Sequence, residues 1–268
     1  MAQDTLAPAP PTRSPGSPIV IARDLRKRYG SLQAVDGVSF EIAEGEVFGI
    51  LGPNGAGKTT TLEMIEGMRQ IDSGSAIVDG IDVSKDPRGV KARIGIQLQA
   101  SSFFDELNLV ELLELFGHLY ERDVDAMALL AQVELTEKAR SQVRTLSGGQ
   151  KQRFSIAAAL VNDPRVLFLD EPITGLDPQA RRHLWGFVSD ISKRGHTVVL
   201  TTHYMEEAEE LCDRVAIMDR GVIVALDAPD RLVDSLIGRG FTKARVERLA
   251  NLEDVFLDLT GHDLREDD

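Results

Sequence analysis

The sequence predicts an α/β fold in which buried strands alternate with helices around a glycine-rich turn. An apolar, β-branched run at 47–51 precedes the turn at 52–60, and a helical pattern begins directly after it. Further apolar runs at 166–169 and 197–200 have the length and composition of strands that are buried on both faces. With 268 residues and 43% hydrophobic content, the chain can bury the core of one large or two small domains.

The N-terminal segment differs from the rest in composition. Residues 1–17 contain four of the eleven prolines, separated by Ala, Ser and Thr, and we expect a disordered leader. Strands are predicted at 19–21 and 38–42, with Tyr29 between them. The Tyr29 ring can stack on a planar ligand, although packing is the alternative role.

The turn that follows the strand at 47–51 has the features of a phosphate-binding P-loop. Its residues are Gly52, Pro53, Asn54, Gly55, Ala56, Gly57, Lys58, Thr59 and Thr60. Glycines let successive backbone N–H groups point at phosphate oxygens, and the positive end of the new helix adds to this. Lys58 should reach the β- and γ-phosphates while the Thr59 hydroxyl takes a place on Mg²⁺. A glycine turn before an ordinary helix is the simpler alternative, and the strand and helix on either side argue against it.

The middle of the chain contains strands, a loop amide and a helical insert. Strands are predicted at 76–78 and 94–96, and the second leads into Gln99, which can coordinate a metal, orient water or be a solvated loop amide. Leucines recur at helical intervals across 106–141, and a second helical pattern covers 126–135. A capping box, formed by Asn108 and Glu111, begins this insert.

A second anion-binding site is predicted where Ser147 precedes two glycines. Ser147 is a natural N-cap, and Gly148 and Gly149 leave the backbone N–H groups of the helix start accessible. A plain cap would explain the serine but not two glycines, each of which costs a helix roughly 1 kcal/mol.

Three polar side chains follow two of the buried strands. Asp170 and Glu171 come directly after the run at 166–169, and His203 follows the run at 197–200. Ligands of open α/β sheets bind at these strand ends. Asp170 can enter the Mg²⁺ shell, Glu171 can polarise an attacking water, and His203 can contact a γ-phosphate. A solvated turn is the alternative role for the two carboxylates.

The C-terminal part completes the alternation. Strands are predicted at 214–218 and 222–225, a helix from about Asp227 to Leu236, and a short amphipathic helix at 252–261. The only cysteine excludes an internal disulfide, and we expect the Cys212 side chain to be buried rather than reactive.

Charge and hydropathy limit the partners. The 30 Lys and Arg against 43 Asp and Glu give a net charge of −13, which is a poor match to DNA, RNA or an anionic membrane surface. No stretch approaches the roughly 20 apolar residues of a membrane span. If the chain works at a membrane, we expect another protein to hold it there.

Taken together in their order, these stretches resemble the ATP-binding subunit of an ABC transporter over about residues 18–260. In this resemblance, Tyr29 corresponds to the adenine-stacking aromatic of the A-loop, residues 52–60 correspond to Walker A, and Gln99 corresponds to the Q-loop glutamine. The LSGGQ signature corresponds to Leu146, Ser147, Gly148, Gly149 and Gln150. Walker B ends at residues 169–172, the D-loop corresponds to residues 175–177, and the switch histidine corresponds to His203. It implies a P-loop NTPase fold of the ABC type, with a RecA-like core, an antiparallel β subdomain and an α-helical insert at about 100–162. It also implies an ATPase that uses ATP and Mg²⁺, with Glu171, His203, Lys58 and Gln99 in catalysis and Thr59, Gln99 and Asp170 at the metal.

Two positions depart from the family pattern. Leu98 stands where the family often has proline, and Gln97 precedes it, so that either Gln97 or Gln99 can face the metal. Ile173 stands where threonine is common, and we expect this to alter packing only. The stretch at 252–261 looks like the ending of daunorubicin-resistance type exporter ATPases, which pair with a separate ABC-2 type permease.

The resemblance further implies a head-to-tail homodimer, because Lys58 and Ser147 both bind the γ-phosphate in this family. We expect a leader at 1–17, an ATPase domain at 18–237 and an extension at 238–268. We expect the protein on the cytoplasmic side of the cell membrane, where the permease holds it as a peripheral subunit. The expected function is export of a drug, antibiotic or lipid-like compound, with no nucleic acid partner. An import ATPase, and a soluble ABC ATPase acting on ribosomes or DNA, are the alternatives.

Overall fold

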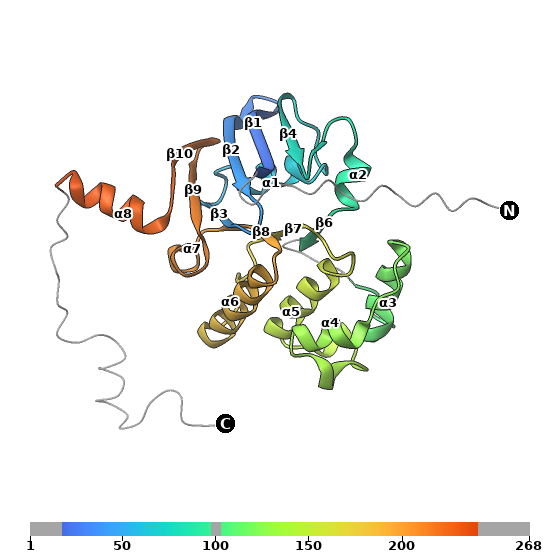
Figure 1. Cartoon of the computed structure of the whole chain (residues 1–268). Helices are drawn as coiled ribbons and strands as arrows, with labels where there is room; N and C mark the ends of the chain where they lie inside the picture. The colour runs from blue at the N-terminus through green and yellow to red at the C-terminus, as the bar shows by residue number, and fades with distance from the viewer. Residues whose placement is uncertain (1–17, 98–102, 241–268) are drawn as a thin grey trace, which may run out of the picture. The chain divides into compact units, whose positions relative to one another are not determined.

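A computed structural model of the chain describes residues 18–97 and 103–240 (Figure 1). The chain divides into two compact units, residues 1–232 and 233–268, and the site described below lies in the first. Within the described ranges, no helix is long and apolar enough to cross a membrane.

The central element is a six-stranded sheet with the order β10-β9-β3-β8-β7-β6. Its strands are β3 (Val47–Leu51), β6 (Ile94–Gln97), β7 (Val166–Asp170), β8 (Thr197–Thr202), β9 (Arg214–Asp219) and β10 (Val222–Asp227). All neighbours pair in parallel except β9 and β10, which are antiparallel. Because parallel strands end at one edge, the register pairs Leu51 with Thr202 and Asp170 with Thr201 there.

A separate antiparallel sheet has the order β2-β1-β4-β5. It contains β1 (Pro18–Tyr29), β2 (Leu32–Ala43), β4 (Ser73–Val78) and β5 (Ile81–Asp82). The predicted strands at 19–21 and 38–42 were therefore too short, and Tyr29 ends a strand rather than lying between strands. Sequence periodicity missed the extensions because one face of an antiparallel sheet can remain solvated, and charged residues interrupt the apolar pattern there.

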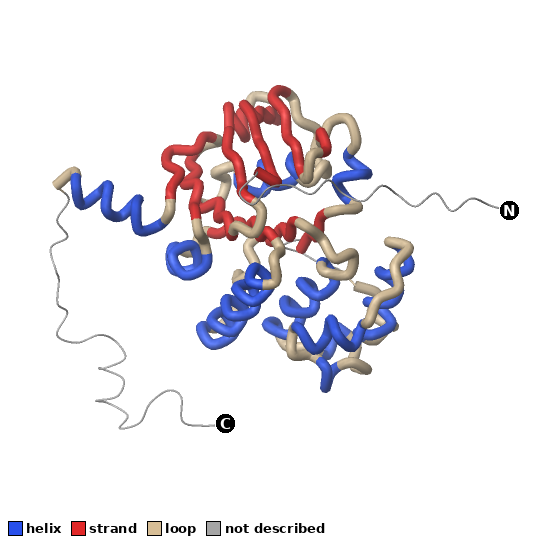
Figure 2. The backbone as a smooth tube through the Cα atoms, viewed as in Figure 1, coloured by secondary structure: helices blue, strands red, loops and turns tan. Residues whose placement is uncertain are grey.

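Helices cover both faces of the central sheet (Figures 1 and 2). The first unit contains α1 (Lys58–Ile65), α2 (Pro87–Lys91), α3 (Leu109–Leu119), α4 (Ala126–Gln132), α5 (Gly148–Ala159), α6 (Pro178–Lys193) and α7 (Met205–Leu211), with 3₁₀ turns at Thr136–Lys138 and Val143–Thr145. The last described helix is α8 (Pro229–Gly238), which presents Val233, Leu236 and Ile237 as exposed side chains. In Figure 1, α1 and the antiparallel sheet lie on one side of the central sheet, and α5 and α6 lie on the other.

The helical insert confirms one boundary and corrects another. Asn108 and Glu111 form the predicted capping box, in which the Asn108 side chain accepts from the Glu111 N–H at 3.1 Å and Glu111 accepts from the Asn108 N–H at 2.8 Å. The pattern predicted at 126–135 ends as a helix at Gln132. Glu134 has φ 53°, a left-handed conformation that stops the helix before Leu135, which is buried in the core.

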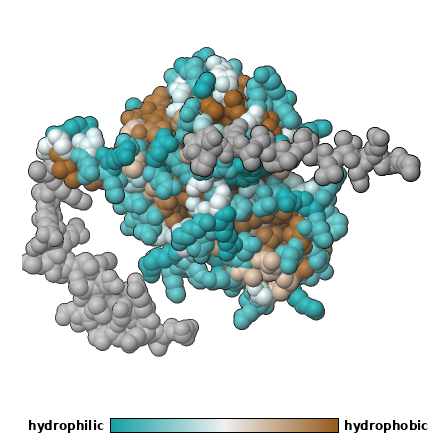
Figure 3. Space-filling model, in the orientation of Figure 1, coloured by the Kyte–Doolittle hydropathy of each residue, from teal (hydrophilic) through white to brown (hydrophobic). Residues whose placement is uncertain are grey.

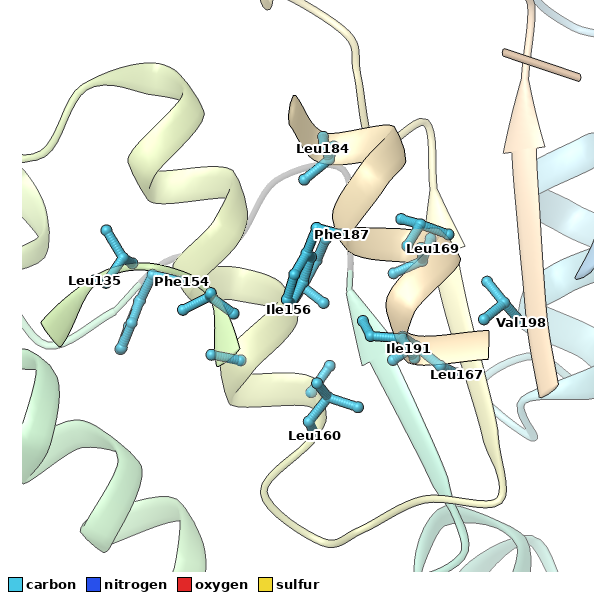
Figure 4. Close-up of a cluster of buried hydrophobic side chains, with 14 of the residues drawn as sticks. Leu135, Phe154, Ile156, Leu160, Leu167, Leu169, Leu184, Phe187, Ile191 and Val198 are labelled. Carbon is cyan, nitrogen blue, oxygen red and sulfur yellow. The ribbon is translucent and has the colours of Figure 1, made fainter. Parts of the chain in front are cut away.

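Two clusters of buried side chains pack on opposite faces of the central strands. One joins the sheet to α5 and α6 and includes Phe154, Leu169 and Phe187 (Figure 4). The other joins it to α1 and the antiparallel sheet and includes Phe48. Alternate residues of β7 enter different clusters, which explains why this strand is apolar throughout. Cys212 is buried as predicted, and this burial raises the pKa of its thiol.

Candidate active site

The loop between β3 and α1 approaches neighbouring backbone so closely that only glycine fits at two positions. Gly57 caps α1 with φ 100°, and a Cβ atom there would lie 2.4 Å from the carbonyl oxygen of Ala34. A Cβ atom at Gly52 would lie 2.2 Å from the carbonyl oxygen of Met218. The loop is therefore held against both sheets, and its backbone conformation depends on these glycines.

A cavity of about 780 Å³ opens beside this loop. Its lining residues are Tyr29, Leu32, Gln33, Ala34, Asn54, Gly55, Gly57, Lys58, Thr59, Thr60, Glu171 and Arg220. Leu32, Gln33, Ala34 and Arg220 were not predicted from the sequence. Arg220 reaches the cavity from the turn between β9 and β10, and a single sequence contains no signal for that proximity.

Three of the predicted loop residues do not line the cavity. The carbonyl oxygens of Gly52 and Pro53 accept hydrogen bonds from Lys58 Nζ at 2.9 and 3.1 Å. Ala56 is buried in the core. The loop therefore shapes the cavity with its backbone as well as with its side chains.

Tyr29 lines the cavity, and two cations lie near its ring. The guanidinium carbon of Arg69 is 5.4 Å from the centre of the Tyr29 ring, and Lys27 Nζ is 5.9 Å from it. Glu63 accepts a hydrogen bond from Arg69 Nε at 2.5 Å and holds that side chain near the ring. These contacts fix the ring at the cavity wall, where the adenine-stacking role was predicted.

Lys58 is the buried cation of the site. Its side chain is 4% exposed, and its Nζ lies 3.4 Å from Glu171 Oε1 in addition to its two backbone bonds. The first residue of α1 thus directs an ammonium group into the cavity toward the end of β7.

Asp170 and Thr59 form an oxygen-rich pair below the cavity. Thr59 Oγ1 lies 3.2 Å from both carboxylate oxygens of Asp170, and the Thr201 hydroxyl donates to the same carboxylate at 2.5 Å. Burial raises the pKa of Asp170, and the hydrogen bonds from Thr201 and Thr59 oppose that shift. Thr201 was not predicted as a site residue, because its contact depends on the β7–β8 register.

Glu171 and His203 meet at the ends of β7 and β8. His203 Nδ1 lies 3.3 Å from Glu171 Oε2, and the Thr174 hydroxyl donates to that same oxygen at 3.2 Å. Glu171 has φ 48°, a conformation that costs a non-glycine residue about 1 kcal/mol or more, and its N–H donates to Thr201 Oγ1 at 3.0 Å. Backbone strain of this kind is typical of functional sites.

A second buried carboxyl group lies near the site and was missed by sequence reasoning. Glu66 follows α1 and is 2% exposed. Burial, with smaller contributions from the charges of Asp170 and Glu63, raises the pKa of Glu66 to about 8. This shift favours the protonated form of Glu66 at neutral pH.

The two glutamines at the end of β6 fall on different sides of the described boundary. Gln97 is 1% exposed and pairs in register with Leu169, one residue before Asp170. Gln99 lies outside the described residues, so its predicted contact with the metal stays a prediction.

A second cavity, of about 330 Å³, contains the other predicted anion site. It is lined by Ser147, Gly148, Gly149, Gln150, Arg153, Gly175, Leu176, Asp177, Gln179, Ala180 and His183. Ser147 caps α5 as predicted: its hydroxyl accepts from the Gln150 N–H at 3.3 Å, and the Gln150 side chain accepts from the Ser147 N–H at 3.0 Å. Ser147 and Lys58 thus line separate cavities within one chain.

Comparisons with known proteins agree with this geometry. The sequence profile described as ABC transporter matches residues 35–174. Nod factor export ATP-binding protein I of Ralstonia nicotianae is 41% identical over 235 residues, which cover 85% of this chain and 73% of that protein. Linearmycin resistance ATP-binding protein LnrL of Bacillus subtilis is 41% identical over 222 residues, which cover 81% and 71%.

A solved structure supports the same assignment. The dimeric post-hydrolysis state of the ATP-binding cassette MJ0796 bound to ADP and Pi matches with a TM-score of 0.70 and 26% identity, over 78% of this chain and 98% of that one. The predicted P-loop NTPase fold of the ABC type is confirmed. The chain belongs to the ABC transporter family and is an ATPase of the kind that drives transport.

Proposed function

We propose that this chain is the ATP-hydrolysing subunit of an exporter and drives a separate transmembrane permease of the ABC-2 type. The observation that carries this proposal is that Lys58 and Glu171 line one cavity with 3.4 Å between their charged groups, and that His203 lies 3.3 Å from Glu171. Export is favoured because the relatives are named for Nod factor export and linearmycin resistance. We infer a drug, an antibiotic or a lipid-like compound as the cargo.

In this proposal the cavity binds ATP. Tyr29 stacks on the adenine, the N–H groups of Gly55 and Gly57 with the helix start bind phosphate oxygens, and Lys58 neutralises the β- and γ-phosphates. Without nucleotide, the Lys58 ammonium group donates hydrogen bonds to two carbonyl oxygens and pairs with Glu171. When ATP binds, phosphate oxygens replace these partners. Glu171 then becomes available to accept a proton from the attacking water, and His203 contacts the γ-phosphate.

The oxygen donors beside this cavity fit Mg²⁺. Thr59 and Asp170 supply one hydroxyl and one carboxylate, and a magnesium site of this class is completed by phosphate oxygens and water. Within the described ranges, no group of three or more His, Cys, Asp or Glu could hold a metal by itself, which agrees with a site that forms only with nucleotide. When bound, the ion neutralises charge on the transferring phosphate. Gln99 remains the proposed further ligand.

A second copy of this chain supplies the other half of the site. Ser147 to Gln150 line a cavity apart from Lys58, so we infer that these residues close over ATP that is bound by a partner copy. The MJ0796 cassette is dimeric, which supports a dimer of this chain. Each copy has a net charge of −13, and screening over about 8 Å at physiological salt limits their repulsion to close approach.

The permease contact is proposed on the helical insert. Phe103 is partly buried against Phe154, with 5.1 Å between ring centres, whereas Phe104 is 62% exposed. Figure 3 shows apolar side chains at the surface in the region between α5 and α3. A permease that covers this region would hold the chain at the cytoplasmic side of the membrane.

Substitution of Glu171 tests the proposed chemistry. Glu171→Gln should keep ATP binding and lower turnover about a hundredfold, while Lys58→Ala should also weaken binding. Glu210→Gln, an exposed change on α7, serves as the matched control and should hydrolyse ATP at the wild-type rate. Wild-type turnover by Glu171→Gln would refute the assignment, and stimulation by RNA or DNA rather than by the permease would favour a soluble ABC ATPase.

A further inference from the structure

A row of side chains joins the second cavity to the Glu171–His203 pair. It begins at Leu176, which lines that cavity and whose carbonyl oxygen accepts a hydrogen bond from Arg181 Nε at 2.9 Å. The guanidinium carbon of Arg181 lies 4.5 Å from the centre of the Tyr204 ring. The Tyr204 and His203 rings are 4.2 Å apart between centres and 35° from parallel. The row ends at Glu171, 3.3 Å from His203 Nδ1.

The two middle members of the row, Arg181 and Tyr204, are held in place by the fold. Arg181 lies in the first turns of α6, whose start is held by Asp177: its side chain accepts from the Gln179 and Ala180 N–H groups at 2.9 and 2.8 Å. The Tyr204 N–H donates to Thr202 Oγ1 at 3.0 Å, which sets the backbone at the end of β8. A displacement of α6 relative to β8 therefore has to change the stacking of Arg181 on Tyr204.

A buried acid belongs to the helix that follows the row. Glu207 on α7 is 0% exposed, and the side chains of Thr202 and Trp185 lie beside its carboxyl group. The charge of Arg181 acts on the same group. The guanidinium thus contacts an aromatic face and a backbone carbonyl, a surrounding that suits the planar arginine side chain and not lysine.

We propose that Arg181 is a positioning residue, which sets the His203 imidazole against Glu171 through the Tyr204 ring. The proposal rests on the proposed roles of Glu171 and His203. Arg181 does not line the nucleotide cavity, so its effect is indirect. Its bond to Leu176 connects the histidine to the cavity that contains Ser147, so contact of a partner at that cavity is transmitted to the groups that act on the γ-phosphate.

The test compares Arg181→Ala with Arg182→Ala, the neighbouring exposed arginine of the same helix. Arg181→Ala should lower kcat about ten- to a hundredfold because a small misplacement of a reacting group has that effect, while KM for ATP changes less than about twofold. Arg181→Lys should restore little of the loss, and Arg182→Ala should match the wild type. A merely structural role would raise KM or lower the thermal midpoint along with kcat.

The tyrosine supplies an independent arm if Arg181→Ala folds poorly. Tyr204→Phe keeps the ring and should retain wild-type kcat, whereas Tyr204→Leu should lose as much as Arg181→Ala. The double variant of Arg181→Ala with Tyr204→Leu should be no slower than either single variant, because both break the same row. The inference would be overturned if the loss of kcat in the double variant equalled the product of the two single losses. It would also be overturned if Arg181→Ala and Tyr204→Leu both had the same kcat as Arg182→Ala.

Glu171→Gln is measured in the same series to separate the two proposals. If it loses turnover while the Arg181 and Tyr204 variants do not, only the positioning role fails. If Glu171→Gln keeps wild-type turnover, the proposed function fails and the positioning role fails with it.

Discussion

Thr59 Oγ1 lies 3.2 Å from both carboxylate oxygens of Asp170, although the two residues are 111 positions apart in the sequence. Thr59 is in the first turn of α1, and Asp170 is the last residue of β7. The parallel register of the central sheet brings the strand end to the helix start, and the result is a hydroxyl and a carboxylate directed at the same point. We infer the metal site from this pair.

Substitution of Thr59 should alter the dependence of activity on Mg²⁺. Thr59→Val removes the hydroxyl at nearly constant volume and should raise the Mg²⁺ concentration for half-maximal ATPase activity about tenfold or more. Thr59→Ser keeps the oxygen and should remain near the wild-type value. Equal Mg²⁺ titrations for the valine and serine variants would remove Thr59 from the metal site.

Replacement of Gly57 should damage both the fold and the site. Gly57→Ala forces a Cβ atom to 2.4 Å from the carbonyl oxygen of Ala34 and imposes φ 100° on an alanine. We expect about 2 to 4 kcal/mol less free energy of unfolding, measured by urea denaturation, and loss of ATP binding. Gly186→Ala is the control: it lies inside α6 with open space around it, and should gain about 1 kcal/mol. Equal effects at the two glycines would contradict this account of the loop.

Glu66 should make the fold less stable as the pH rises. Its pKa is about 8 in the folded protein against 4.5 in the unfolded chain, so between these values the unfolded state has lost a proton that the folded state retains. The contribution of Glu66 to the free energy of unfolding should therefore fall by about 1.4 kcal/mol for each pH unit in this window. Glu66→Gln should remove this share of the slope, while the raised pKa of Glu207 keeps a further share below about pH 7.

The pH series is measured by urea denaturation without nucleotide or Mg²⁺, because the charge of Asp170 contributes to the raised pKa of Glu66. Glu210→Gln is again the control and should keep the wild-type slope. Parallel profiles for Glu66→Gln and the wild type would show that the raised pKa of Glu66 does not govern the pH dependence.

The two phenylalanines at the start of the helical insert should behave differently. Phe103 packs on Phe154 and Phe116, with ring centres 5.1 and 6.2 Å away, and Phe103→Ala should cost about 2 to 3 kcal/mol of unfolding free energy. Phe104→Ser should change stability by less than about 0.5 kcal/mol and leave the ATPase activity of the isolated chain unchanged. Coexpressed with its permease, Phe104→Ser should export less, and full export would refute the proposed contact.

Much of the site could be predicted because its residues follow apolar runs. The loop that leads to Lys58 follows one strand that the sequence identifies as buried, Asp170 ends another, and parallel strands end at the same edge of a sheet. The positions of these strands in the sequence were therefore sufficient to predict that the P-loop and the carboxylates lie at the same edge of the sheet. The capping residue Ser147 was predictable for a local reason, since its hydroxyl and the Gln150 side chain pair within one turn.

The remaining features depend on relationships that a single sequence does not contain. The sequence does not distinguish Thr201 from the other residues of its strand. Its hydrogen bond to Asp170 depends on the β7–β8 register. Arg220 lines the cavity beside Lys58 and comes from a turn near the C-terminal end of the first unit. The insert helix ends early because Glu134 adopts a left-handed conformation. Glutamate rarely adopts this conformation, so the residue type gave no reason to predict it.

The central claim is that Ser147 acts on ATP held by a partner copy and not on ATP in its own chain. The most direct test is sedimentation velocity with ATP and Mg²⁺ on Glu171→Gln and on the double variant of Glu171→Gln with Ser147→Arg, with nucleotide binding measured on the same samples. Glu171→Gln should form a dimer, while the double variant should bind ATP yet remain a monomer of 29.4 kDa. Dimers formed equally by the double variant, or loss of ATP binding by its monomer, would contradict the claim.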